Sequence, residues 1–224
     1  MNIVEMPCNP ANYGGIRGSA VKYLVVHYTA GRNDTAVNNG AYFARESVGA
    51  SAHYFVDETT VVRSVPEDRV AWHCGGAIYR HANCRNGNSI GVEICSKYEN
   101  GVYTFAPAAL ERAKALLRWL MARYEIPAER VLRHYDVTGK LCPAPFTGAG
   151  QAHWEAFKGG LQMYNNLEQV PLWARDTVRK LVERDVLQGD GSGLNLSEDL
   201  TRTLVILDRL GLFEEKEGAA CTIS

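Results

Sequence analysis

The chain has 224 residues, of which 46% are hydrophobic and 22% charged, and its formal net charge is −1. These values are ordinary for a globular protein, and the length suits one domain with an appendage. Residues 1–160 carry 17 Lys and Arg against 14 Asp and Glu, and residues 161–224 carry 7 against 11. Neither part is basic enough for nucleic acid to be the main partner, and no apolar run is long enough to span a bilayer.

Four segments of the first 160 residues predict β-strands. KYLVVHYTAG (22–31) is an apolar run that ends at His27 and reaches a glycine four residues later, which is typical of a buried strand. Residues 51–66 read as a hairpin that turns near 57–60. In residues 88–96 successive side chains point to opposite faces of a strand, so that Glu93 lies on the face opposite the isoleucines. Residues 131–135 form a further short strand.

Helices are predicted between these strands, over residues 34–47, 106–126 and 153–166. The second is the clearest, because its apolar residues recur at three- and four-residue steps and Pro107 suits a first turn. Strands and helices therefore mix along the chain, which indicates an α/β layered fold.

The composition changes after the third helix. Residues 170–213 predict a helix–loop–helix, with Ser197 as the N-cap of the second helix. We expect a domain over 1–162, a linker over 163–169 and a small helical appendage over 170–224, which ends in a frayed tail.

The N-terminal residues lack a basic segment followed by an apolar one, so we expect no secretory signal and synthesis in a cytoplasm. The six cysteines would then mostly stay reduced. Cys74 and Cys84 leave three readings open: free thiols, a disulfide across the intervening loop, or a second metal site with His81.

Three residue types in the first domain suit a metal. His27 and His134 each end a predicted strand, and Cys142 lies in the loop that follows. Two imidazoles and a thiolate form an open ligand set for Zn²⁺, although two satisfied histidines and one buried cysteine would look the same from spacing alone. Glu93 and Lys140 strengthen the metal reading. A metal, a carboxylate for proton transfer and an ammonium for the oxyanion together suit amide hydrolysis.

Five blocks occur in one order over about 150 residues: LVVHYTAG, SAHYFVD, VAWHCGG, NSIGVEICS and VLRHYDVTGKLCPAPF. Together they resemble the zinc-dependent N-acetylmuramoyl-L-alanine amidases of the peptidoglycan-recognition-protein superfamily, especially phage endolysins. The resemblance implies a mixed central sheet flanked by helices. It implies His27, His134 and Cys142 as Zn²⁺ ligands, with Glu93 and Lys140 at the catalytic glutamate and lysine positions.

Further site residues follow from the same blocks. Some relatives have a functional tyrosine in the block that reads SAHYF here, and aligning on Phe55 puts His53 at that position, either as a catalytic group or as packing. His73 and Trp72 lie in a segment that resembles the groove rim, where they would bind substrate; structural roles remain the alternatives. Asp136 would either orient His134 or cap the following turn.

The appendage resembles a single S-layer-homology motif, with Leu-Thr-Arg at 200–202. Such motifs bind secondary cell-wall polysaccharide, usually in sets of three. A lone motif implies either homo-oligomerisation through its helices or docking on the catalytic domain.

The resemblance as a whole implies an amidase that cleaves the bond between N-acetylmuramic acid and L-alanine in bacterial peptidoglycan. We expect a phage or prophage endolysin that reaches the cell wall after release through a pore made by another protein. The alternatives are a non-catalytic peptidoglycan-binding module, a bacterial autolysin and a muropeptide amidase.

Overall fold

The computed structural model describes residues 2–189, 191 and 193–214. The chain divides into two compact units, Met1–Lys158 and Gly159–Ser224. Most of the frayed tail predicted after Phe213 lies outside the described residues.

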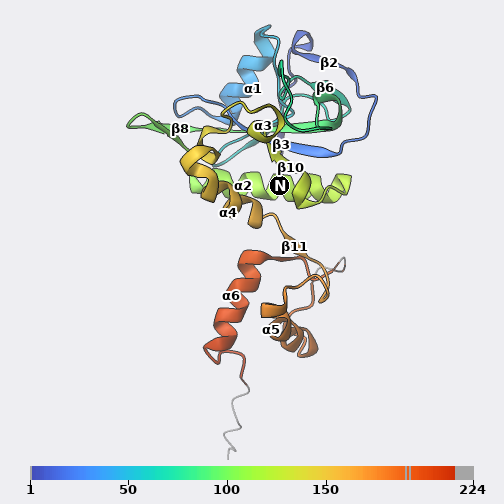
Figure 1. The fold of residues 1–224 in the computed structure, drawn as a ribbon, viewed down its shortest axis with the longest axis vertical. Coiled ribbons are helices and arrows are strands. Elements are labelled where there is room, and N and C mark those ends of the chain that lie inside the picture. The colour runs from blue at the N-terminus through green and yellow to red at the C-terminus, as the bar shows by residue number, and fades with distance from the viewer. Residues whose placement is uncertain (1, 190, 192, 215–224) are drawn as a thin grey trace, which may run out of the picture. The chain divides into compact units, whose positions relative to one another are not determined.

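The first unit is built on a six-stranded sheet with the order β1-β5-β4-β7-β3-β10 (Figure 1). Its strands are β1 (Ile3–Glu5), β3 (Tyr23–Tyr28), β4 (Tyr54–Val56), β5 (Val61–Arg63), β7 (Ser89–Ile94) and β10 (Val131–Arg133). β4, β7, β3 and β10 run parallel to one another, whereas β5 is antiparallel to β4 and parallel to β1. Two small antiparallel pairs lie outside this sheet: β2 (Tyr13–Ile16) with β6 (Arg69–Ala71), and β8 (Lys97–Glu99) with β9 (Val102–Thr104). The α/β class with a mixed central sheet is confirmed.

Helices cover both faces of the sheet (Figure 1). They are α1 (Ala36–Arg45), α2 (Pro107–Tyr124), α3 (His134–Thr138) and α4 (Gln151–Gly159). α2 packs along one face through Leu116, Leu117 and Leu120, all fully buried. Burial of each leucine contributes about 1.5–3 kcal/mol, so this face anchors the sheet. α1 and α3 lie on the opposite side, which is the side of His27, Gly91 and Glu93.

The hairpin predicted over residues 51–66 is confirmed as β4 and β5. Asp57 organises its turn, because one carboxylate oxygen accepts the backbone N–H groups of Thr59 at 2.8 Å and Thr60 at 2.7 Å. The other oxygen accepts the N–H of Ala36 at 2.8 Å. A single buried carboxylate therefore holds both the hairpin turn and the start of α1.

Two predicted boundaries were wrong. The strand predicted over 131–135 ends at Arg133, because the Asp136 carboxylate accepts the Arg133 N–H at 2.8 Å and starts helix α3 there. The helix predicted over 153–166 begins earlier and stops at Gly159.

The second unit contains β11 (Met163–Tyr164), α5 (Leu172–Glu183), β12 (Leu196–Ser197) and α6 (Glu198–Arg209). β11 pairs antiparallel with β12, so the segment expected as a linker begins with a strand of this unit. The N-cap prediction is confirmed, since the Ser197 hydroxyl accepts the Leu200 N–H at 3.2 Å. Its core includes a cluster of six buried residues: Tyr164, Val170, Ala174, Val178, Leu196 and Val205.

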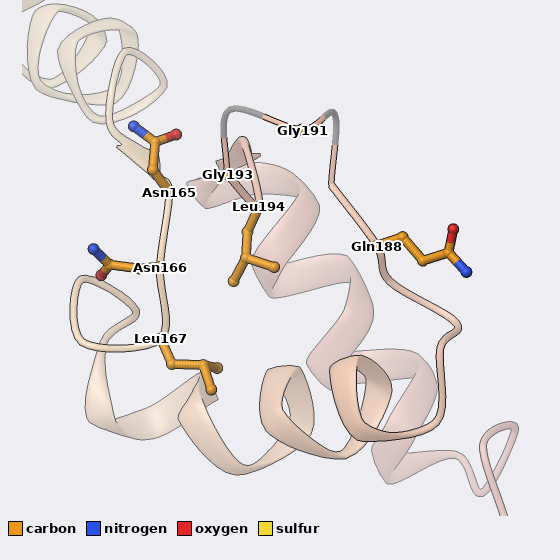
Figure 2. Close-up of a pocket in the computed structure, with 7 residues that line it drawn as sticks. All are labelled: Asn165, Asn166, Leu167, Gln188, Gly191, Gly193 and Leu194. Carbon is orange, nitrogen blue, oxygen red and sulfur yellow. The ribbon is translucent and has the colours of Figure 1, made fainter.

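A pocket of about 390 Å³ lies in the second unit (Figure 2). Asn165, Asn166 and Leu167 line one side of it, and Gln188, Gly191, Gly193 and Leu194 line the rest. Within the described residues, no helix combines the length and the apolar character needed to cross a membrane.

Candidate metal centre and active site

The sheet places His27 beside Glu93. β3 and β7 are parallel neighbours at the centre of the sheet, and His27 and Glu93 are register partners. Side chains at paired positions of adjacent strands project from the same face. The two residues therefore stand side by side near the carboxyl ends of two strands, although 65 positions separate them in the sequence.

His134 and Cys142 reach the same place through a short helix and a loop. β10 lies next to β3 in parallel, and α3 begins at the residue after β10. Gly139 ends α3 with φ = 86°, a left-handed conformation that glycine adopts without strain. The chain then turns back, and the Tyr135 N–H donates to the carbonyl of Cys142 at 2.8 Å. This bond returns Cys142 to the start of the helix, where His134 stands.

The three candidate ligands converge. One ligand atom from each of His27, His134 and Cys142 lies within 4.8 Å of the other two, and all three residues are buried. The Cys142 Sγ is 3.6 Å from Nδ1 of His27, and the two imidazole centroids are 4.8 Å apart. The Nε2 atom of His134 is buried without a hydrogen-bond partner among the described residues. In the part of the chain that the structure describes, this is the one cluster able to hold a metal ion.

The electrostatics of the cluster suit metal ligands. Burial, reinforced by the charges of neighbouring histidines and Lys140, lowers the pKa of His27 well below its usual value. Burial and then Lys140 lower the pKa of His134 to about 4. Both imidazoles are therefore neutral at pH 7, the form that coordinates a metal. Burial, assisted by Glu93, raises the pKa of the Cys142 thiol to about 12, so a cation is needed to stabilise its thiolate.

The donor set of His27, His134 and Cys142 suits Zn²⁺. Two neutral imidazole nitrogens and one thiol are Zn²⁺ ligands, and a three-ligand set leaves a coordination position open. An unpartnered buried nitrogen on His134 is otherwise costly, and a metal ion would satisfy it. The residues present fit zinc.

Burial favours the protonated form of Glu93 near neutral pH. Burial raises the pKa of its carboxyl to about 8, with Lys140 opposing the rise and Asp34 adding to it. Its Oε2 atom is buried and has no hydrogen-bond partner among the described residues. Lys140 is exposed at the side of the cluster, and its positive charge acts on His27, His134 and Glu93 alike. A carboxyl group and an ammonium thus flank the candidate ligands.

The other site candidates are placed differently. His53 is fully buried, its Nδ1 accepts the Gly91 N–H at 3.0 Å, and its Nε2 is 3.2 Å from the Arg69 carbonyl. The same Nε2 also lies 2.9 Å from the Arg17 guanidinium, so both ring nitrogens have partners within the protein. Trp72 is 38% exposed, which leaves part of its indole accessible. The Asp136 carboxylate accepts the Arg133 N–H and so caps the start of α3, whereas the sequence offered it as a partner of His134 or as a cap of the following turn.

His73 turns inward rather than toward a groove. It is 9% exposed, its Nδ1 is 3.0 Å from Nε2 of His27, and its Nε2 is 3.2 Å from Oγ of Ser89. Sequence reasoning missed Ser89 and also Gly91, on which the His73 ring packs. The glycine in the middle of a central strand was the available signal, because such a residue often marks a close approach.

Cys74 and Cys84 are free thiols in the structure, both fully buried in one cluster with Tyr23 and Val25. His81 is engaged elsewhere, since its Nδ1 accepts the backbone N–H groups of Asn83 at 3.2 Å and Cys84 at 2.9 Å. Of the three interpretations of Cys74 and Cys84, free thiols agree with the structure.

Comparison with known proteins places these features in a family. Residues 17–145 match the N-acetylmuramoyl-L-alanine amidase family, and this range includes every candidate site residue named above. The amidase CwlL of Bacillus licheniformis is 33% identical over 141 residues, which cover 59% of this chain and 38% of the relative. The amidase BlyA of Bacillus subtilis is 33% identical over 159 residues, covering 65% and 42%. The chain thus spans about two fifths of the length of these curated relatives.

Solved structures agree with this assignment. The catalytic domain of XlyA superposes with a TM-score of 0.60 at 29% identity, over 72% of this chain and 100% of that one. A mutant endolysin from Bacillus subtilis gives a TM-score of 0.59 at 29% identity, over 72% and 99%. The family match covers more than half of the sequence, and the chain belongs to the N-acetylmuramoyl-L-alanine amidase family.

Proposed function

We propose that the chain is a zinc-dependent peptidoglycan amidase that hydrolyses the amide bond between N-acetylmuramic acid and the L-alanine of the stem peptide. One observation carries the proposal: His27, His134 and Cys142 offer three convergent ligand atoms directly beside a buried, unpartnered carboxyl oxygen of Glu93. The family match and the amidase names of the relatives give the substrate class.

Zinc bound to these ligands would acidify a water molecule and polarise the scissile carbonyl. Glu93 stands beside His27 on the adjacent strand, where its carboxylate accepts a proton from the attacking water. The same carboxyl then returns the proton to the amine of L-alanine as it leaves. The raised pKa of Glu93 matches this work near neutral pH, because an efficient proton-transfer group has a pKa near the working pH.

The ammonium of Lys140 supplies positive charge where the oxyanion develops. Its influence on His27, His134 and Glu93 supports a position on the open side of the cluster. We assign the base role to Glu93 rather than to His53, since both ring nitrogens of the buried His53 already have partners within the protein.

Metal content and wall lysis test the proposal together. Wild type and Cys142→Ser are purified, their bound zinc is measured, and the turbidity of isolated cell walls is followed with each. We expect wild type to hold one zinc ion, to clear the walls and to release new L-alanine amino termini. Cys142→Ser should lose most of its zinc and its activity. Wild type that holds no zinc, or clears walls without new L-alanine termini, would refute the proposal.

Glu93→Ala separates catalysis from metal binding. A proton-transfer group contributes about 10²–10⁴-fold to rate, so we expect a loss of that size with zinc content unchanged. This variant also addresses the non-catalytic alternative, because a module that only binds peptidoglycan would bind walls equally well with alanine there. Loss of zinc from Glu93→Ala would make Glu93 a structural residue.

For the second unit we propose binding to secondary cell-wall polysaccharide, in the context of a phage or prophage endolysin that acts on the wall after release from the cytoplasm. Resemblance to an S-layer-homology motif supports this, as does the pocket that Asn165, Asn166 and Gln188 help to line (Figure 2). Pull-down with purified walls, before and after chemical removal of the polysaccharide, tests it. Equal binding to both preparations would contradict the proposal.

A further inference from the structure

A chain of hydrogen bonds leads from the backbone to the candidate metal centre. It begins at the Arg85 carbonyl, which accepts from the Ser89 hydroxyl at 2.7 Å. The Ser89 oxygen is 3.2 Å from Nε2 of His73, and Nδ1 of His73 is 3.0 Å from Nε2 of His27. The remaining nitrogen of His27, Nδ1, is 3.6 Å from Cys142 Sγ. Four residues are thus joined in a line that ends at the cluster.

The direction of this chain is fixed at its first member. A carbonyl oxygen has no proton, so the Ser89 hydroxyl must be the donor to Arg85. With its proton committed, the Ser89 oxygen can only accept from His73, which requires a proton on the Nε2 atom of His73. A neutral imidazole carries one proton, so the Nδ1 atom of His73 is an acceptor. It therefore accepts from an Nε2–H of His27, which leaves the Nδ1 lone pair of His27 free.

The packing around His73 is specific to this arrangement. A Cβ atom on Gly91 would lie 2.5 Å from Cγ of His73, closer than real contacts allow. Glycine in the central strand β7 thus makes the space through which the His73 ring reaches His27. On its far side the ring packs edge-on against His53, with centroids 5.7 Å apart. The ring is held in place by shape as well as by hydrogen bonds.

We propose that His73 is a positioning residue that, with Ser89 and the Arg85 carbonyl, holds His27 in the Nε2–H tautomer so that its Nδ1 faces the metal. The inference rests on the proposed zinc site. Hydrogen-bonded partners behind a metal ligand fix its tautomer and ring orientation, and their loss typically weakens metal affinity about 10–100-fold. This positioning role replaces the substrate-binding role that the sequence predicted for His73, because neither ring nitrogen remains free for substrate.

Two variants of His73 and one control test the proposal. His73→Leu keeps volume but removes the acceptor, whereas His73→Asn places an amide oxygen at the position of Nδ1. His153→Leu replaces an exposed histidine in α4 and serves as the matched control. Zinc affinity is measured by competition with a chromophoric chelator. Far-ultraviolet circular dichroism checks that each variant is folded.

We expect His73→Leu to raise the zinc dissociation constant about 10–100-fold, His73→Asn to recover most of that loss, and His153→Leu to change nothing. A constant for His73→Leu within threefold of wild type would overturn the inference. So would an equal loss in His73→Asn and His73→Leu, which would indicate simple packing.

Tautomers are measured directly, without activity and without any variant. Nitrogen-15 spectra of the histidine side chains in metal-free wild type should show Nε2–H tautomers for both His27 and His73. An Nδ1–H tautomer at His27 would overturn the inference even if His73→Leu failed to fold. If wild type had no zinc affinity, the proposed function would be refuted, and the hydrogen bonds from Arg85 to His27 would have no metal ligand to position. Tight zinc binding in both wild type and His73→Leu would refute this inference alone.

Discussion

Replacing Glu93 with glutamine should stabilise the metal-free protein at high pH. Glu93 has a buried carboxyl oxygen with no partner among the described residues, and burial raises its pKa from 4.5 to about 8. The folded state therefore binds the proton more tightly than the unfolded state. Stability is retained while the carboxyl is protonated and falls as the pH rises from about 4.5 to 8. Glutamine resembles the neutral acid and carries no such penalty.

The magnitude follows from the shift. Raising the pKa of this carboxyl from 4.5 to about 8 lowers the stability of the folded wild type by about 4.8 kcal/mol at pH 9. At pH 5 the same change lowers it by only about 1 kcal/mol. Glu93 is partly accessible and Lys140 is near, so solvent screening reduces the difference between the two pH values to about 2–4 kcal/mol.

The assay is urea unfolding of EDTA-treated, reduced wild type and Glu93→Gln at pH 5 and pH 9. Groups common to both proteins cancel in the comparison. Glu93→Gln should gain about 2–4 kcal/mol on wild type between the two pH values. An unchanged difference would show that the Glu93 carboxylate is solvated in the folded chain and that its burial does not tune its proton affinity.

Two further predictions concern Asp57 and Arg133, whose hydrogen bonds stabilise elements of the first unit. Burial alone would raise the pKa of Asp57, but hydrogen bonds from three backbone N–H groups and a threonine hydroxyl outweigh it and hold the pKa below the usual value. Asp57→Asn should lower the free energy of unfolding in urea by about 2 kcal/mol at pH 7. This loss should shrink as the pH falls below 3.8, where the carboxylate of wild type protonates. A loss independent of pH would contradict the role of the Asp57 charge. Arg133 is buried and bonds Asp136 at 2.6 Å and the Phe146 carbonyl at 2.6 Å, so Arg133→Lys should cost about 3 kcal/mol. Arg179→Lys, in an exposed pair, should cost less than about 1 kcal/mol, and equal costs for the two arginines would contradict the assignment.

Local patterns predicted most elements and the hairpin of β4 and β5, but not the pairing of strands that are distant in the sequence. The alternation of residues 88–96 correctly separates Glu93 from the isoleucines, and the step pattern of 106–126 matches α2. That Glu93 lies beside His27 depends on parallel pairing between β3 and β7, which no local pattern specifies. The sequence therefore indicated the face of Glu93 but not its neighbour.

The convergence of His134 and Cys142 also depended on detail beyond periodicity. The sequence predicted a strand end and a loop here, yet Asp136 and Gly139 delimit a helix of five residues. Such short helices are set by caps and turns rather than by an apolar repeat. The three-ligand set itself was suggested by family resemblance, and spacing alone left it undecided between a metal site and ordinary packing.

The close contact of Gly91 with His73 has a consequence for how this sequence can drift. While position 73 holds an imidazole, any side chain at 91 collides with it, since even a Cβ would come within 2.5 Å. If position 73 first became small, alanine or serine at 91 would fill the space instead of clashing. The two positions should therefore change together in descendants of this chain, and the order of the two substitutions should decide whether the intermediate folds.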